Sequence, residues 1–446
     1  MGRLFGTDGI RGLANQEPIT TENGVKFGRS VVRFCKDRGL STDIVIGRDT
    51  RISGEMLERA VASGITSAGG KALCVGVLPT PGVAFLTKDL NAGAGVVLSA
   101  SHNPWEYNGF KLFSSEGYKL SDTEEAEIEA MILEQVDYPV GKDHVRPDLV
   151  EDALEKYVSF LLKSFSGPAD IRKKKIVLDC ANGATSQVAP LLFEKLGCNP
   201  EVMFAHPDGK NINLNCGSQH TGALSSRVVA SKADIGLAFD GDGDRLIAVD
   251  EKGKTLTGDQ ILMICASMLK EKGELNNNVL VSTVMSNIGL KSALRDAEID
   301  HVAAGVGDRL VMEEMKNLGS SIGGEESGHI IFLDLHTTGD GILAALQLLT
   351  ALGRTEQKLS DLSNLMTVYP QTLLNLEVKS KPEIKEVSDL LAIIRDIECM
   401  LGEEGRVLVR YSGTEPVCRI MVEGKDQKEI EDYARRIGDV VLSQLG

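Results

Sequence analysis

A serine in a short polar segment is the first candidate for chemistry in this sequence. Ser101 lies in SASHNP, at residues 99–104, directly after the apolar run 94–98, so it stands at the end of a predicted strand. A hydroxyl presented there can act as a nucleophile. The Gly-x-Ser-x-Gly elbow of acyl-transfer enzymes is absent, because Ala100 and His102 flank the serine. Taken alone, the segment is also compatible with an ordinary turn that has no chemical role.

A second segment, DGDGDR at residues 240–245, alternates carboxylates with glycines. With no Cβ between them, the side chains of Asp240, Asp242 and Asp244 can converge on one hard cation. A calcium-binding EF-hand requires glycine where this sequence has Arg245, and helices where it predicts strands. The pattern therefore favours a catalytic Mg²⁺, held by carboxylates and a phosphate oxygen, over calcium or a solvated acidic turn.

A third segment, GGEESGH at residues 323–329, also follows a predicted strand. Its carboxylates and hydroxyl suit adjacent sugar hydroxyls, and His329 can donate to a phosphate or ring oxygen. On its own, the segment is equally compatible with an exposed turn.

A fourth segment, RYSGTEP at residues 410–416, combines backbone N–H groups, two hydroxyls and a guanidinium, with a second arginine beyond it. Such groups form a nest for a phosphate dianion. The P-loop pattern is absent, so a nucleoside triphosphate is not indicated. The residues assigned to this nest are Arg410, Ser412, Gly413, Thr414 and Arg419.

Together the four segments supply a serine that can form a covalent intermediate, a loop that can bind a divalent cation, a segment that can bind sugar hydroxyls, and a nest for a phosphate. Their combination predicts phosphoryl transfer on a small phosphorylated polyol without ATP.

Alternating β-branched runs and amphipathic stretches predict the βαβ units that position these segments. Strands are expected at 44–47, 72–77, 94–98, 176–178, 235–239, 279–282 and near 322, and helices at 55–68, around 157–161, and after 184, 258 and 287. Beyond a linker at 366–371 the pattern changes to longer strands, at 372–378 and 406–422, and a final helix that Asp426 and Glu429 begin with a capping box.

This pattern predicts an α/β protein with three consecutive α/β domains, whose sheets are mixed and largely parallel, and a smaller C-terminal α+β domain, around a central cleft. The expected domains are 1–149 with the serine, 150–255 with the metal loop, 256–368 with the sugar loop and 369–446 with the phosphate nest.

Composition limits the partners. The 446 residues include 64 acidic and 48 basic side chains, a net charge of -16, which disfavours nucleic acid and anionic membranes. A phosphorylated substrate therefore needs a local basic pocket. No run approaches the ~20 apolar residues of a membrane helix, and residues 1–8 lack a signal-peptide core, so a cytoplasmic protein is expected. The eight cysteines form no Cys-x-x-Cys pair and are expected to be mostly buried thiols.

In the segments SASHNP, DGDGDR, GEESGH and SGTEP, which occur in this order, the chain resembles the α-D-phosphohexomutases over essentially its whole length. Within that family it is most similar to the branch that acts on glucosamine phosphates. The segments that carry this similarity are LFGTDGIRG at 4–12, VGDR at 306–309, HIIFLD at 329–334 and TTGDG at 337–341.

The resemblance implies an enzyme that carries a phosphate on Ser101. The phosphoryl group would pass to glucosamine 6-phosphate, giving the 1,6-bisphosphate. This intermediate would turn around and return its other phosphate, releasing glucosamine 1-phosphate on the route to UDP-N-acetylglucosamine. One Mg²⁺ per chain would be held by Ser101, Asp240, Asp242 and Asp244, and glucosamine or glucose 1,6-bisphosphate would be the activator.

The resemblance also implies roles for further residues. Lys111 is the leading candidate for the general base of the transfer, because cations and a metal nearby would lower its pKa. The alternative is that Lys111 only complements the charge of the phosphoryl group, without proton transfer. Arg11 would steady the transferred group, and His102 and Arg245 would stabilise it. Glu325, Ser327 and His329 would bind the sugar phosphate, whose distal phosphate would lie on the nest of the fourth segment.

Two departures from the glucosamine branch concern the choice of sugar. Glu326 stands where that branch has Gln, and residues 303–305 lack a Thr common there. A phosphomannomutase or phosphoglucomutase is therefore the alternative, and a metal-dependent sugar phosphatase and a non-catalytic phosphosugar-binding protein are alternatives of other classes. We expect a small phosphosugar as the partner, no nucleic acid or membrane, and a homodimer as one option for the assembly.

Overall fold

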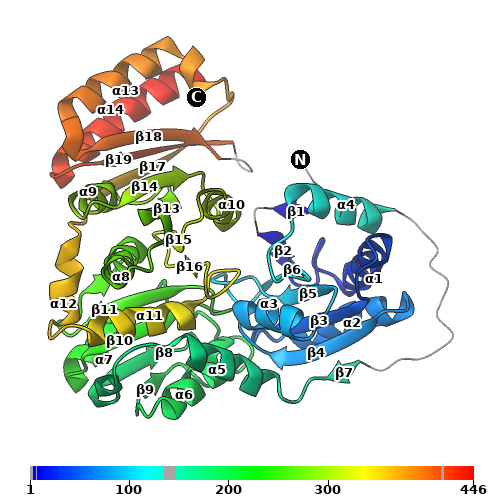
Figure 1. The fold of residues 1–446 in the computed structure, drawn as a ribbon. Coiled ribbons are helices and arrows are strands. Elements are labelled where there is room, and N and C mark those ends of the chain that lie inside the picture. Colours follow the sequence, from blue (N-terminus) through cyan, green and yellow to red (C-terminus); the bar gives the residue numbers. More distant parts are fainter. Residues whose placement is uncertain (1–3, 7, 135–146, 413–415) are drawn as a thin grey trace. The chain divides into compact units, whose positions relative to one another are not determined.

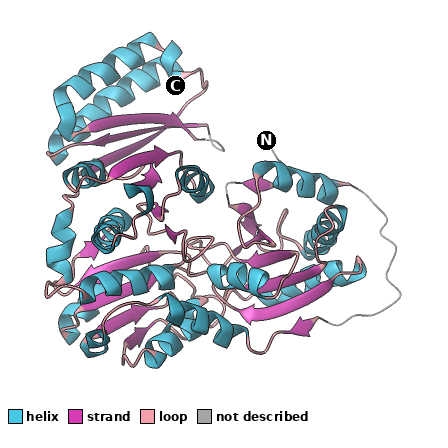
Figure 2. Cartoon of the chain, viewed as in Figure 1, coloured by secondary structure: helices cyan, strands magenta, loops and turns pink. Residues whose placement is uncertain are grey.

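The computed structural model describes residues 4–6, 8–134, 147–412 and 416–446. The chain divides into two compact units. The first comprises Met1–Met285 and Ile299–Leu365, and the second comprises Ser286–Glu298 and Met366–Gly446. Strands in both units are flanked by helices (Figure 2).

The N-terminal sheet of the first unit has the strand order β1-β2-β6-β5-β3-β4-β7 in the described part of the chain. Strands β5, β3, β4 and β7 are parallel to their neighbours in this set. The pairs β1–β2, β2–β6 and β6–β5 are antiparallel. The bounds are β1 Phe5–Gly6, β2 Gly9–Leu13, β3 Asp43–Arg48, β4 Lys71–Val77, β5 Ala94–Leu98, β6 Tyr107–Ser114 and β7 Asp148–Leu149.

Alternation along the buried strands β3 and β5 distributes the side chains between two helical layers. Ile44, Ile46 and Val96 belong to a core that also contains residues of α1 (Thr21–Asp37), α2 (Gly54–Ser67) and α4 (Asp122–Leu133). The opposite face is covered by α3 (Thr80–Asp89), as Figure 1 shows. The strand ends that carry the serine segment are thus fixed from both sides.

Two further sheets complete the first unit. One has the order β12-β11-β10-β8-β9 and the other β14-β13-β15-β16, each with parallel strands and an antiparallel edge. Their strands are β8 Ile176–Asp179, β9 Glu201–Met203, β10 Ile235–Phe239, β11 Leu246–Asp250, β12 Thr255–Leu256, β13 Val279–Thr283, β14 Asp300–Ala304, β15 Ile322–Gly324 and β16 Ile330–Phe332. The helices are α5 Ala153–Ser164, α6 Thr185–Lys195, α7 Gly222–Ser231, α8 Gly258–Lys272, α10 Asp308–Leu318, α11 Gly341–Gly353 and α12 Leu359–Leu362.

The second unit is a small α+β structure. Its antiparallel sheet has the order β17-β19-β18, with β17 Gln371–Glu377, β18 Arg406–Tyr411 and β19 Val417–Glu423. The helices are α9 Ile288–Asp296, α13 Ser388–Leu401 and α14 Gln427–Leu445. The Asp426 carboxylate accepts hydrogen bonds from the N–H groups of Lys428 and Glu429, so Asp426 is the N-cap of α14, without, in the described residues 416–446, the reciprocal Glu429 bond that the predicted capping box requires.

The predicted fold class is confirmed: mixed, partly parallel sheets with helices are followed by a smaller C-terminal α+β part. The α9 segment is the exception to chain order, because it packs with the C-terminal part although it precedes β14. Six of the eight free cysteines are buried, as expected. Among the described residues, the longest apolar helices fall short of what a membrane crossing requires.

Each of the four functional segments joins two antiparallel neighbours in a sheet. The serine segment connects β5 to β6, the metal segment β10 to β11, the sugar segment β15 to β16 and the phosphate segment β18 to β19. The two ends of each segment are therefore held in one sheet.

Candidate active site

Ser101 is buried in the turn between β5 and β6, with 1% of its surface exposed. Its backbone φ of +50° lies in the left-handed region, which is uncommon for a residue with a side chain. The Ser101 hydroxyl donates to Asp240 Oδ2 at 2.7 Å, and His102 Nδ1 lies 3.4 Å from Ser101 Oγ. The serine and the metal segment, 139 residues apart in the chain, are therefore in direct contact.

The three aspartates form one buried cluster. Oxygen atoms of Asp240, Asp242 and Asp244 lie within 4.8 Å of one another. The loops approach closely enough only because residue 241 is glycine: a Cβ there would lie 2.6 Å from the carbonyl oxygen of Ser101. The N-terminus of α3 fixes the middle carboxylate, since Thr80 Oγ1 donates to Asp242 Oδ2 at 2.5 Å.

The donor set fits a hard divalent cation. Asp242 Oδ1 and Asp244 Oδ1 are buried and have no hydrogen-bond partner among the described residues. Burial and the charges of Asp244 and Asp242 raise the pKa of Asp240 well above its ordinary value. A cation bound between the oxygens would satisfy the two lone atoms and cancel the repulsion.

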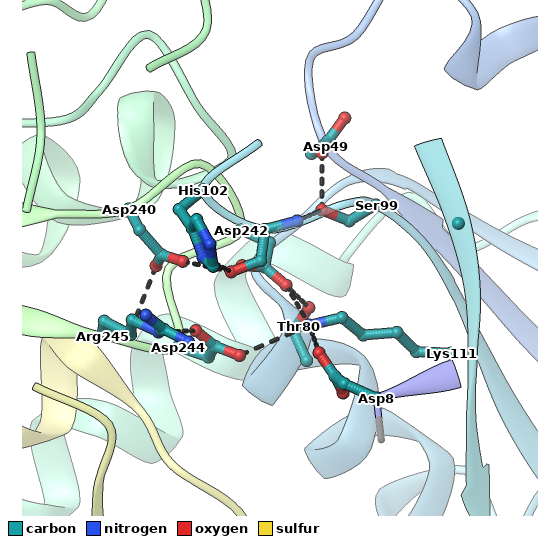
Figure 3. Close-up of polar contacts among 12 residues, drawn as sticks. Asp8, Asp49, Thr80, Ser99, His102, Lys111, Asp240, Asp242, Asp244 and Arg245 are labelled. Carbon is teal, nitrogen blue, oxygen red and sulfur yellow. Dashed lines mark hydrogen bonds and ion pairs between the residues drawn. The ribbon is translucent and has the colours of Figure 1, made fainter. Parts of the chain in front are cut away.

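Lys111 projects from β6 into this cluster (Figure 3). Its Nζ lies 2.7 Å from Asp242 Oδ2, 3.2 Å from Asp8 Oδ2 and 3.4 Å from Asp244 Oδ2. Burial favours the neutral amine, but the three carboxylates outweigh it and raise the pKa of Lys111 above its ordinary value. Without a metal ion this direction is opposite to the lowered pKa expected from the sequence, because three carboxylates outweigh the effect of Arg11 on the ammonium group.

Sequence reasoning overlooked an ion-pair chain beside Lys111. Lys119 lies between Asp8 and Asp308, and Asp308 in turn lies 3.4 Å from His329 Nε2. Asp8 and Asp308 fall in the segments 4–12 and 306–309, so their position in signature motifs was an available signal. The sequence contained no signal for Lys119, because it is a single basic residue outside every motif.

The other predicted cations lie around the serine. Arg11 forms an ion pair with Asp8, and Arg245 Nε lies 3.9 Å from Asp244 Oδ1. Burial and the charges of Arg245 and Arg11 lower the pKa of His102 to about 4. His102 is thus a neutral imidazole at pH 7, able to accept or donate one hydrogen bond through each nitrogen according to its tautomer.

The sugar segment lies against the metal segment. Leu246 N donates to the Gly328 carbonyl oxygen at 2.9 Å, and Arg245 and His329 form an isolated β-bridge. Within the turn, Ser327 Oγ donates to Glu325 Oε2 at 3.2 Å. Burial opposes protonation of His329, but nearby carboxylates, first that of Asp244, raise the pKa of its imidazole. The structure thus brings the predicted sugar-binding side chains next to the aspartate cluster.

The phosphate segment belongs to the second unit. Arg410 on β18 is paired directly across from Arg419 on β19, so two positive side chains share one face of the sheet. Ser412 is buried, and its carbonyl oxygen accepts a hydrogen bond from Lys381 Nζ at 2.7 Å. Gly413 and Thr414 lie outside the described residues.

Comparison with known proteins identifies the family. Four models match successive parts of the chain. They are described as Phosphoglucomutase/phosphomannomutase alpha/beta/alpha domain I (residues 2–138), domain II (155–253), domain III (257–369) and C-terminal domain (373–440). The chain belongs to the phosphoglucomutase/phosphomannomutase family. The order of the four matches is the order of the four functional segments.

Individual relatives extend over the full length. The chain is 52% identical over 449 residues to the phosphoglucosamine mutase of Syntrophus aciditrophicus and 52% identical over 455 residues to that of Syntrophobacter fumaroxidans, covering 100% of each protein and of itself. Among solved structures it resembles a phosphoglucomutase/phosphomannomutase family protein of Burkholderia thailandensis, with a TM-score of 0.82 at 24% identity, covering 99% of this chain and 98% of that one.

A second solved structure shares the fold at lower similarity. Aspergillus fumigatus N-acetylphosphoglucosamine mutase, in complex with GlcNAc-6P and magnesium, has a TM-score of 0.68 at 17% identity, covering 98% of this chain and 96% of that one. At such identities the structures establish the family fold and no more.

Proposed function

We propose that this chain is a phosphoglucosamine mutase that interconverts glucosamine 6-phosphate and glucosamine 1-phosphate. The observation that carries the proposal is the 52% identity, over the whole length of both chains, to relatives of that name. The buried contact between the Ser101 hydroxyl and the aspartate cluster supports the phosphoryl-carrier chemistry that such an isomerisation needs.

The proposed reaction consists of two transfers through Ser101. In the first, the bond between phosphorus and Ser101 Oγ breaks as phosphorus bonds to the free hydroxyl of the substrate, and the proton of that hydroxyl ends on Ser101 Oγ. The product is a 1,6-bisphosphate. After the sugar turns around, Ser101 Oγ takes the other phosphoryl group, and the proton of the Ser101 hydroxyl ends on the sugar oxygen that this group leaves. A bisphosphate of glucosamine or glucose would supply the phosphate for a dephosphorylated chain.

Asp240, Asp242 and Asp244 would hold one Mg²⁺ together with an oxygen of phosphorylated Ser101. Bound there, the metal would neutralise charge on the phosphoryl group as its bonds loosen. The carboxylates keep their positions through the contacts with Thr80 and Lys111 described above.

Lys111 is proposed as a charge partner of the transferring phosphoryl group. This is the alternative to the general base favoured from the sequence, and the contact of its Nζ with three carboxylates supports it, since they retain the proton. Arg11 and Arg245 would add positive charge on the same group. His102, next to the Ser101 hydroxyl, would hydrogen-bond to one of its oxygens.

Substrate recognition is assigned to the sugar and phosphate segments. Glu325 and Ser327 would accept and donate hydrogen bonds to adjacent sugar hydroxyls, and His329 would bind a phosphate or ring oxygen. The phosphate that is not being transferred would bind to the nest. Its residues are Arg410, Ser412, Gly413, Thr414 and Arg419.

A phosphomannomutase or phosphoglucomutase is the second candidate, which Glu326 favoured at the level of sequence. In the structure the Glu326 carboxyl hydrogen-bonds to Thr283 of β13, and burial raises its pKa. A carboxyl group that already hydrogen-bonds to the protein has less capacity than Glu325 to hydrogen-bond to the hydroxyls of a sugar. Its contact therefore weakens the argument for mannose or glucose.

One assay distinguishes the candidates. The purified protein is first tested by intact mass for one phosphate, an addition of about 80 Da. Turnover of glucosamine, glucose and mannose 6-phosphates is then compared with a bisphosphate activator present. We expect the highest kcat/KM for glucosamine 6-phosphate; a higher value for mannose or glucose phosphate would contradict the proposal. Release of inorganic phosphate in step with substrate loss would instead identify a phosphatase.

The proposed function also implies a location and an assembly for the protein. We expect a cytoplasmic enzyme, since the substrates are intracellular phosphosugars, and a homodimer as one option for its assembly. Light scattering of the purified chain measures the mass of the particle in solution.

A further inference from the structure

The backbone of Ser101 is held by a buried ring of interactions that lies behind the catalytic face. Ser101 N donates to Ser99 Oγ at 2.9 Å. Ser99 Oγ donates in turn to Asp49 Oδ2 at 2.6 Å, as Figure 3 shows. Asp49 Oδ2 is also 2.8 Å from Arg51 Nε. Arg51 Nη2 then donates to the carbonyl oxygen of Ser101 at 2.9 Å, which closes the ring.

The Arg51 guanidinium makes further contacts with the same turn. Its Nη2 donates to the Asn103 carbonyl oxygen at 2.8 Å, and its Nη1 donates to the carbonyl oxygens of Tyr107, at 3.0 Å, and Pro104. Four backbone carbonyls between residues 101 and 107 thus accept hydrogen bonds from one side chain. The Asp49 and Arg51 side chains are both fully buried.

We propose that Asp49 and Arg51 are positioning residues that fix the left-handed backbone of Ser101 and so aim its Oγ at the aspartate cluster. The inference deepens the proposed function, on which it rests, because it concerns the residue that would carry the phosphoryl group. The hydrogen bonds of Asp49 and Arg51 reach Ser99 and the backbone of residues 101–107 rather than the Ser101 hydroxyl or the aspartate side chains, so we assign both a role through the backbone.

The geometry explains why an ion pair is needed here. A left-handed backbone at a residue with a side chain relaxes unless its surroundings hold it, and one ring fixes both the N–H and the C=O of Ser101. The planar guanidinium reaches several carbonyls at once, which the single ammonium of lysine does not. Asn213, from the loop between β9 and α7, adds a hydrogen bond to the Ser101 carbonyl oxygen at 2.9 Å.

The first test replaces the guanidinium while keeping its charge. In Arg51→Lys we expect kcat to fall about 100-fold, because a displacement of ~1 Å at the reacting group has that effect. KM should stay within about threefold, since the sugar and phosphate segments are untouched. The matched control is Arg48→Lys: Arg48 is the last residue of β3, three residues before Arg51, and its side chain pairs with Glu58 at 3.0 Å rather than with the carbonyls that Arg51 binds. It should retain wild-type kcat.

A second variant keeps the inference testable if Arg51→Lys does not fold. Ser99→Ala leaves the Asp49–Arg51 pair intact and removes only the link between Asp49 and the Ser101 N–H. We expect kcat to fall about tenfold at unchanged KM. Wild-type kcat in whichever variant folds, or a loss expressed in KM alone, would overturn the positioning role.

A third measurement is independent of the reaction. Amide hydrogen exchange of residues 99–108 needs no substrate, and we expect faster exchange there in Arg51→Lys and Ser99→Ala than in Arg48→Lys and wild type. Unchanged exchange in both variants refutes the inference whatever their activity. If wild-type protein fails to isomerise glucosamine phosphates, the proposed function is wrong, and the exchange comparison still decides whether the ring holds the turn.

Discussion

Removal of one carboxylate from the aspartate cluster should stabilise the metal-free protein while it abolishes activity. The substitution that tests this is Asp240→Asn. The hydrogen bonds of this side chain are compatible with an amide: the Arg245 N–H donates to Asp240 Oδ1 at 3.2 Å, and the Ser101 hydroxyl lies 2.7 Å from Oδ2, where an amide nitrogen can donate in return. The substitution therefore removes charge and little else.

The magnitude follows from the separations in the cluster. Two unit charges no more than 4.8 Å apart repel by about 3 kcal/mol or more at an effective dielectric constant of ~20. Asp240 has two such neighbours, and Lys111 and Arg245 offset part of their repulsion. We expect a net gain of about 1–3 kcal/mol without metal, and an increase of the unfolding midpoint by roughly 1–4 °C, because a unit of this size has a large unfolding entropy.

Thermal unfolding with EDTA and with Mg²⁺ tests this reasoning. In EDTA the Asp240→Asn variant should unfold at a higher temperature than wild type. With Mg²⁺ at about 100 times the dissociation constant of the wild type, wild type should gain ~2.7 kcal/mol and the variant much less, so the difference between them narrows or reverses. The matched control is Asp250→Asn, because Asp250 is equally buried and uses one oxygen for two backbone N–H groups, which an amide oxygen also accepts. A variant less stable than wild type in EDTA would refute the repulsion argument.

Three further outcomes are expected. Ser101→Ala should lose isomerisation by on the order of 10³-fold or more and show no added 80 Da; wild-type turnover would exclude Ser101 as carrier. Arg410→Ala should raise KM roughly 10–100-fold with little change in kcat, since a phosphate contact exists in ground and transition states alike, and a pure kcat defect would contradict the nest. Burial raises the pKa of Asp340, which caps α11 and accepts a hydrogen bond from Tyr157, to about 6. A raised carboxyl pKa means that the folded state retains the proton longer, so wild-type stability should decline as the pH rises from about 4 to about 6, and Asp340→Asn should show a smaller decline in denaturant unfolding across that range.

The sequence was sufficient for the fold class because its signals were local. Apolar runs of four to seven residues predicted strands such as 44–47, 94–98 and 235–239, and the structure places strands at Asp43–Arg48, Ala94–Leu98 and Ile235–Phe239. The convergence of the three aspartates followed equally from spacing, since glycines between them leave no other obstacle. The domain boundaries at 149, 255 and 368 stay a prediction.

The environment of Lys111 was not predictable, because it depends on contacts between distant parts of the chain. Its three carboxylate neighbours come from residue 8 and from residues 242 and 244, more than a hundred residues away. A sequence motif identifies such groups one at a time and does not give the sign of the charge around each. Arg51 shows the same limit: its partners are backbone carbonyls, which no side-chain pattern records.

The charge balance of the assembled site explains how an acidic protein can handle a phosphorylated group. Without phosphate or metal, the buried cluster contains nearly equal numbers of opposite charges. They are Asp8, Asp240, Asp242, Asp244 and Asp308 against Arg11, Lys111, Lys119 and Arg245, beside His329, whose pKa the nearby carboxylates raise. A phosphoserine dianion adds close to two negative charges, and a divalent cation adds two positive charges beside it. Each ligand alone would leave a buried excess of charge, which is costly in a low-dielectric site, whereas the pair leaves the balance of the cluster unchanged. The same contacts account for the unpartnered Oδ1 atoms of Asp242 and Asp244. Lys111 Nζ donates to the Oδ2 atom of each carboxylate, which leaves each Oδ1 atom to accept the cation.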